Sequence, residues 1–187
     1  MKKIPFNLIA AAGVVLLLSI NACKPKNAGN AVGSDAAAKA YVAPGKYDQF
    51  YNFVSGGFSG QMSAYGLPSG RLLRVIPVFS VDPEKGYGYS EETKPMLNTS
   101  HGFVPWDDLH HVQMSKTDGD YDGRWAFGNA NNTPRVARID LKTFRTAEII
   151  ELPNSGGNHS SPFITENTEY VVAGTRSEEH TSELQSL

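Results

Sequence analysis

Four histidines in the body of the chain are the side chains whose type and spacing best suit metal chemistry. They are His101, the adjacent pair His110 and His111, and His159. Imidazole is a usual ligand for copper, zinc and nickel, and among these copper binds most strongly. The single cysteine, Cys23, lies near the N-terminus, so the body of the chain offers no thiolate ligand. The residues favour a histidine-bound copper or zinc; the alternative is histidines that are merely exposed or hydrogen-bonded within the fold.

The adjacent histidines can bind the same centre only under certain conditions. Neighbouring side chains on a regular strand point to opposite faces. His110 and His111 therefore need an irregular strand end, or a centre of several metal ions, if both are to bind it. His159 follows His111 by 48 residues, close to the length of one blade of a β-propeller. One blade period would place these two histidines at equivalent positions on successive innermost strands, which line the propeller axis.

The elements that could position these histidines are short strands between turn-forming residues. Four such strands are predicted at residues 110–114, 124–127, 135–141 and 147–152. Four antiparallel strands in about 45 residues match the size of one propeller blade. A further strand is predicted at 170–174, and residues 47–53 suit either a short helix or an extended arm. Because no later segment has a helical period, the chain is predicted to be all-β, with about two to three propeller blades over residues 47–176.

The composition is that of an ordinary globular protein. The 187 residues include 17 Lys and Arg against 19 Asp and Glu, which gives a net charge of −2, and 40% are hydrophobic. This length suits one domain at most. The balanced charge argues against nucleic acid as a partner, and the single cysteine excludes a disulfide scaffold.

The N-terminal segment has the pattern of an export signal. Lys2 and Lys3 precede an apolar run over residues 8–18, and Cys23 follows a small residue shortly after that run. The run of 11 residues is shorter than the roughly 20 that a membrane-spanning helix needs. We expect a lipoprotein signal peptide over 1–22 and acylation at Cys23. Asn21 is an unusual neighbour for such a site, and ordinary cleavage nearby is the alternative.

The segments that flank the predicted domain lack the composition of a folded core. Residues 23–46 are rich in Ala, Asn, Gly and Lys, so we expect a flexible linker there. At the other end, residues 176–186 read Arg-Ser-Glu-Glu-His-Thr-Ser-Glu-Leu-Gln-Ser, the first-frame translation of a common sequencing-adapter DNA. We interpret residues 177–187 as an adapter-derived artefact rather than a short acidic helix, with Arg176 compatible with either origin. This removes His180 from the candidate ligands and predicts that the natural protein is longer.

Four segments carry a resemblance to a known family. They are residues 55–79, residues 108–127 around the histidine pair, residues 130–144, and residues 148–163 around His159. In order and spacing they resemble nitrous oxide reductases, specifically the branch exported by the general secretory route. The resemblance covers nearly all of residues 47–176, and it implies part of a seven-bladed β-propeller.

The family resemblance also implies roles for individual residues. His110, His111 and His159 would be three of the seven histidine ligands of a tetranuclear copper-sulfide centre. Asp108 is a candidate hydrogen-bond acceptor for an imidazole N–H, a partner that fixes the orientation of a ligand, although a carboxylate that caps a turn is the alternative. His101 matches no ligand position and is interpreted as a loop histidine.

The implied function is the last step of denitrification, the reduction of N2O with two electrons and two protons to N2 and water. The resemblance implies a periplasmic homodimer that takes electrons from a donor such as a c-type cytochrome. The remaining four ligands and a cupredoxin domain with a dinuclear copper centre would lie beyond this chain, so the fragment alone is predicted to be inactive. A non-catalytic periplasmic β-propeller that binds another molecule is the alternative function.

Overall fold

The computed structural model describes residues 34–174, which form parts of two compact units, residues 1–41 and 42–187. The predicted signal peptide, the acylation site Cys23 and the predicted artefact at 177–187 lie outside the described residues. Among the described residues, no helix is long and apolar enough to span a membrane.

In the first unit the described element is the helix α2, Ser34–Ala40. Alanine has the highest helix propensity, and four of the seven residues are Ala. Lys39 and Asp35 form an ion pair of 2.7 Å one turn apart, with the acid near the N-terminus and the base near the C-terminus, as the helix dipole favours. This helix lies within residues 23–46, where a flexible linker was predicted. A run of alanines buries too little apolar surface to form a core, but it readily forms a local helix.

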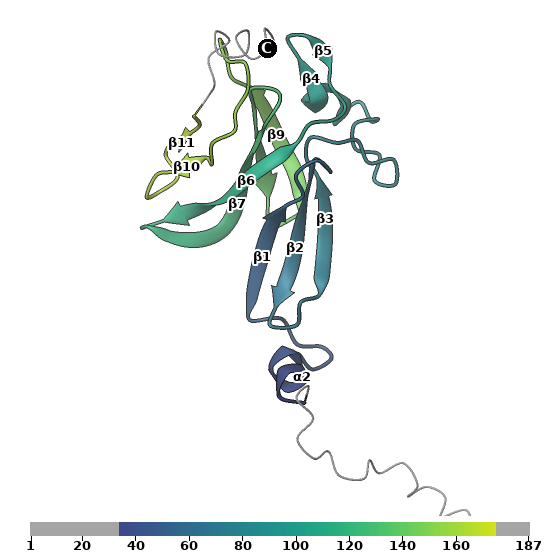
Figure 1. Cartoon of the computed structure of the whole chain (residues 1–187), viewed down its shortest axis with the longest axis vertical. Helices are drawn as coiled ribbons and strands as arrows, with labels where there is room; N and C mark the ends of the chain where they lie inside the picture. Colours follow the sequence, from purple (N-terminus) through teal and green to yellow (C-terminus); the bar gives the residue numbers. More distant parts are fainter. Residues whose placement is uncertain (1–33, 175–187) are drawn as a thin grey trace, which may run out of the picture. The chain divides into compact units, whose positions relative to one another are not determined.

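The second unit begins with a three-stranded antiparallel sheet in the order β1-β2-β3 (Figure 1). Its strands are β1, Phe50–Ser55, β2, Gln61–Leu67, and β3, Leu72–Pro77. In β2 every second residue is buried, Met62 and Ala64 among them, which is the period of a strand with one face on a core. Because β1 begins at Phe50 and no helix precedes it in residues 47–49, the structure has the extended one of the two alternatives for residues 47–53.

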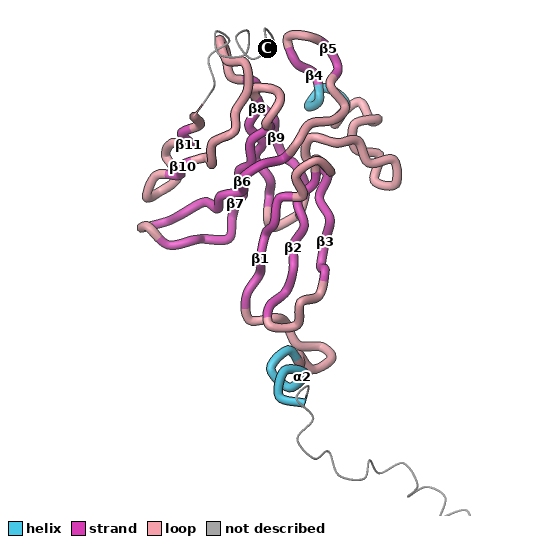
Figure 2. Tube along the Cα trace, viewed as in Figure 1, coloured by secondary structure: helices cyan, strands magenta, loops and turns pink. Residues whose placement is uncertain are grey.

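A four-stranded antiparallel sheet in the order β6-β7-β8-β9 follows (Figure 2). Its strands are β6, Leu109–Thr117, β7, Asp120–Ala130, β8, Arg135–Asp140, and β9, Arg145–Glu151. All four overlap the predicted strands. β6 and β7 run further into the predicted polar turn, because Asp118 and Gly119, at φ 52° and 83°, form a two-residue hairpin turn that needs positive φ at both positions.

The two sheets enclose one hydrophobic core. From the first sheet and the residues after it come Met62, Ile76, Val78 and Phe79, and from the second Leu109, Ala126, Ala130, Ala137, Ile139 and Leu141. β1 packs next to β6 and β3 next to β9. The strand β6 is therefore fixed from both sides, by β7 in its own sheet and by β1 of the neighbouring sheet.

A buried ion pair holds the segment that leads into β6. Arg135 Nη2 lies 3.3 Å from Asp107 Oδ2, and both side chains are fully buried. Burial lowers the pKa of the Arg135 guanidinium, while the Asp107 carboxylate acts in the opposite direction. Asp107 also accepts hydrogen bonds from Asn132 and Thr133. The chain is thus anchored immediately before Asp108 and the histidine pair.

The remaining strands are short pairs. β4, Asn98–Thr99, pairs with β5, Gly102–Phe103, after the 3-10 helix η2, Lys94–Leu97, and β10, Phe163–Ile164, pairs with β11, Val171–Val172. The strand predicted at 170–174 thus forms at its centre. The all-β prediction is confirmed. The separate antiparallel sheets, one of which has four sequential strands like a propeller blade, are consistent with a partial β-propeller.

Candidate metal centre

An irregularity in β6 brings the two adjacent histidines together. The pairing of β6 with β7 shifts register between His110 and Gln113, and His111 has φ 46°, an uncommon value for a residue with a side chain. This bulge breaks the strict alternation of side chains along the strand. The ring centroids of His110 and His111 are 5.3 Å apart. The irregular strand that the sequence required is therefore present.

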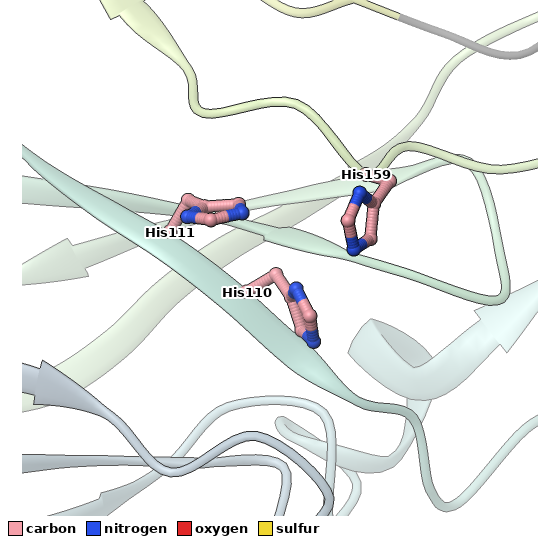
Figure 3. Close-up of side chains that lie close together, drawn as sticks. All are labelled: His110, His111 and His159. Atoms are coloured by element: carbon pink, nitrogen blue, oxygen red, sulfur yellow. The ribbon is translucent and has the colours of Figure 1, made fainter.

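His159 approaches the pair from the segment between β9 and β10 (Figure 3). Its ring centroid lies 4.8 Å from that of His110 and 5.8 Å from that of His111. His159 is not on a strand, which corrects the prediction of equivalent positions on successive innermost strands. Pro162 has no N–H for a strand ladder, and β10 begins only at Phe163.

One ligand atom from each of His110, His111 and His159 lies within 4.8 Å of the others. Within residues 34–174 this is the one group of three or more His, Cys, Asp or Glu side chains close enough to hold a metal ion. His101 lies apart from the group, exposed in the turn between β4 and β5. The three predicted ligands are therefore brought together, and the predicted loop histidine is in a loop.

Asp108 contacts one of these histidines directly. Its carboxylate is buried, and Oδ2 lies 2.8 Å from His110 Nε2. A carboxylate oxygen this close to Nε2 suits a proton on that nitrogen, which leaves Nδ1 of His110 as the nitrogen that can bind a metal. Asn131 Nδ2 also donates to Oδ2, at 3.2 Å. Of the two alternatives for Asp108, the structure favours the contact with the imidazole.

A further residue beside the histidines, Asn129, was not among the predicted site residues. It is fully buried on β7, opposite His110 in the strand register, and its side-chain amide donates to the backbone carbonyl of Asn158. The strand predicted at 124–127 ended before Asn129, because the Asn and Gly residues that follow are typical of turns. Only the observation that β7 continues to Ala130 reveals the contact.

The donor set suits copper or zinc. All three candidate ligands are imidazoles, and no carboxylate joins them in the group. Copper and zinc favour nitrogen ligands, whereas hard cations such as magnesium and calcium favour oxygen. His110 is partly buried, whereas His111 and His159 are exposed. The group is thus held on its His110 side by the fold and is open on the other.

Comparison with known proteins gives the family. The nitrous-oxide reductase of Pseudomonas fluorescens is 36% identical over 163 residues, which are 83% of this chain and 25% of the relative. That of Ralstonia nicotianae is 37% identical over 166 residues, 82% of this chain and 25% of the relative. By sequence, this chain belongs to the nitrous-oxide reductase family. The enzyme of Stutzerimonas stutzeri gives a similar match, 35% over 146 residues, 74% of this chain and 23% of the relative.

The match to nitrous-oxide reductases confirms the resemblance that the four sequence segments indicated. The chain spans about a quarter of the length of these curated reductases. No protein-family model matches it. Family membership therefore rests on the pairwise similarity to reductases from several bacteria.

Proposed function

We propose that this chain is the N-terminal part of a copper-dependent nitrous-oxide reductase, an enzyme that converts N2O, two electrons and two protons into N2 and water as the last step of denitrification. The observation that carries the proposal is the convergence of three imidazoles from two segments 48 residues apart in a chain of this family. Convergence from distant segments is typical of a built metal site rather than of a surface run of histidines.

His110, His111 and His159 would hold the metal as three of the seven ligands of a tetranuclear copper-sulfide centre. When bound, that centre supplies the electrons and the site that activates the inert N2O molecule. The residues of this chain hold and orient it. The exposure of His111 and His159 is consistent with further ligands arriving from other blades.

Asp108 would fix the proton on His110 Nε2 and keep Nδ1 directed at the centre. A carboxylate on the far nitrogen of a ligand imidazole raises the basicity of the ligand and holds the ring in one orientation. The 2.8 Å contact between Asp108 and His110 supports this role. Burial of the carboxylate shields the contact from water, which strengthens it.

The export pattern supports a periplasmic location with a lipid anchor at Cys23. In the same proposal, the other four histidines and a cupredoxin domain with a dinuclear copper centre lie in the part of the protein beyond this chain. Electrons would reach that domain from a donor such as a c-type cytochrome, in a homodimer.

The direct test is to sequence the complete gene, without the adapter-derived segment, and to characterise the protein that it encodes. The complete protein should carry four further histidines in propeller strands and a cupredoxin segment, bind copper, and consume N2O when given reduced viologen. A complete protein without those histidines, or one that binds copper but consumes no N2O, would contradict the proposal and leave the non-catalytic propeller as the better account.

A further inference from the structure

Asn129 links two parts of the histidine group that come from different segments. It lies opposite His110 in the pairing of β6 with β7, so its position relative to His110 is set by the strand ladder. Its amide Nδ2 donates to the backbone carbonyl of Asn158, the residue before His159. Asn129 and Asn158 are both fully buried, so water does not compete for this bond.

The segment that carries His159 makes few other hydrogen bonds to neighbouring elements close to the histidine. Farther along, Thr168 Oγ1 bonds to Lys116 N and O at 2.7 and 2.8 Å, and Asp118 N donates to Asn167 Oδ1 at 2.8 Å. Those bonds fasten the segment to the far end of β6. Next to His159, Ser160 Oγ donates to the carbonyl of Gly174 at 2.7 Å, but that bond joins two parts of the same segment. The contact with β6, from Gln113 Nε2 to Ser161 Oγ, is long, at 3.4 Å, and exposed.

The backbone around Asn158 also passes very close to the end of β7. A Cβ built on Gly157 would lie 2.9 Å from the carbonyl oxygen of Asn131, nearer than real Cβ atoms come. The segment therefore reaches β7 with no side chain between the two backbones, and Asn129 can bond to the main chain of Asn158 directly.

We propose that Asn129 is a positioning residue that sets the place of His159 relative to His110 before any metal binds. His159 lies outside the strand ladders, so the bond from Asn129 to Asn158 substitutes for the ladder at this point. A ligand already held in place loses less freedom when the metal binds, which raises metal affinity. The inference deepens the proposed function, and its metal readout rests on copper binding at these histidines.

The first experiment needs no metal. In the complete protein without copper, Asn129→Ala should speed hydrogen exchange at the amides of residues 163–165 about 10-fold, because a buried bond that fixes the segment is lost. These amides lie in the β10–β11 pair and its turn, where Thr165 N donates to the carbonyl of Tyr170. Thr146→Val is the matched control: Thr146 Oγ1 donates to the carbonyl of Pro77 at 2.7 Å and is also buried, but it lies on β9. The control should leave exchange at 163–165 unchanged.

The second experiment measures copper. Asn129→Ala should weaken copper binding about 10-fold, the scale typical of residues that orient metal ligands, and Thr146→Val should not. Asn129→Gln keeps an amide donor on a longer side chain, so it should recover most of the affinity while shifting the visible absorption of the centre. If Asn129→Ala does not fold, Asn129→Gln alone decides the question.

The outcomes separate the two proposals. Unchanged exchange at 163–165 in Asn129→Ala, or unchanged copper affinity and absorption in the folded variants of Asn129, would overturn the positioning role. A wild-type protein that binds no copper at all would overturn the proposed function instead, while the exchange experiment would still decide whether Asn129 holds the segment.

Discussion

His110 Nε2 lies 2.8 Å from Oδ2 of the buried Asp108 carboxylate, which leaves Nδ1 as the nitrogen of His110 that can bind a metal. The same carboxylate oxygen accepts a hydrogen bond from Nδ2 of Asn131. Asp108 itself follows Asp107, whose side chain is held by the fully buried Arg135. The orientation of one candidate ligand therefore depends on a chain of buried polar contacts that begins at β8.

Asp108→Leu should lower copper affinity about 10- to 100-fold, because His110 loses the acceptor that fixes its ring. Asp108→Asn keeps an acceptor oxygen and should lose less. Copper bound per subunit in the complete protein at limiting free copper measures both. Asp140→Asn is a suitable control, since Asp140 accepts from Lys142 N in a turn away from the histidines. Wild-type affinity in Asp108→Leu would show that the contact has no role in metal binding.

Cys23→Ser should release the complete protein from the membrane fraction into the soluble periplasm and leave the copper content unchanged. The physical reason is that acyl chains on Cys23 would provide the anchor, and the apolar run of residues 8–18 is too short to replace it. Fractionation followed by immunoblotting measures this, with Lys26→Ser as the control. Continued membrane association of the serine variant would refute acylation at Cys23.

Asp48 should make the first sheet sensitive to acid. Its side chain is buried and accepts bonds from Ser69 N at 3.0 Å and Arg71 Nη2 at 2.8 Å. Burial by itself raises the pKa of Asp48, but the donors at Arg71 and Ser69 outweigh it and lower the pKa overall. A carboxyl with a folded-state pKa below its unfolded value stabilises the fold above that unfolded value, about 4, and loses the contribution as pH falls through the folded pKa.

Asp48→Asn should therefore reduce the difference in urea midpoint between pH 7 and pH 3, measured on the 187-residue chain. Asp35→Asn is the control, because Asp35 is exposed on α2 and pairs only with Lys39 among the described residues. An equal pH dependence in wild type and Asp48→Asn would show that the ion pair with Arg71 contributes nothing to stability.

Much of the fold could be predicted because local patterns decide it. The strands β6 to β9 follow from alternating residues between turn signals, and His110, His111 and His159 were found from their chemical type. The position of His159 could not be predicted, because it depends on where the ladder of β10 begins after Pro162. Asn129 was missed because its contact with Asn158 joins residues that are 29 apart in the sequence, and no local pattern encodes such a pair.

The central claim is that His110, His111 and His159 together bind one copper centre. The measurement that tests it most directly is copper per subunit, with the visible absorption of each copper centre, in the complete protein and in single alanine variants. His159→Ala should lose the histidine-bound centre while a dinuclear centre in a separate domain still loads, because removing one ligand leaves a gap in the coordination. His101→Ala, which changes an exposed turn, should match wild type. A normal centre in His159→Ala would contradict the account.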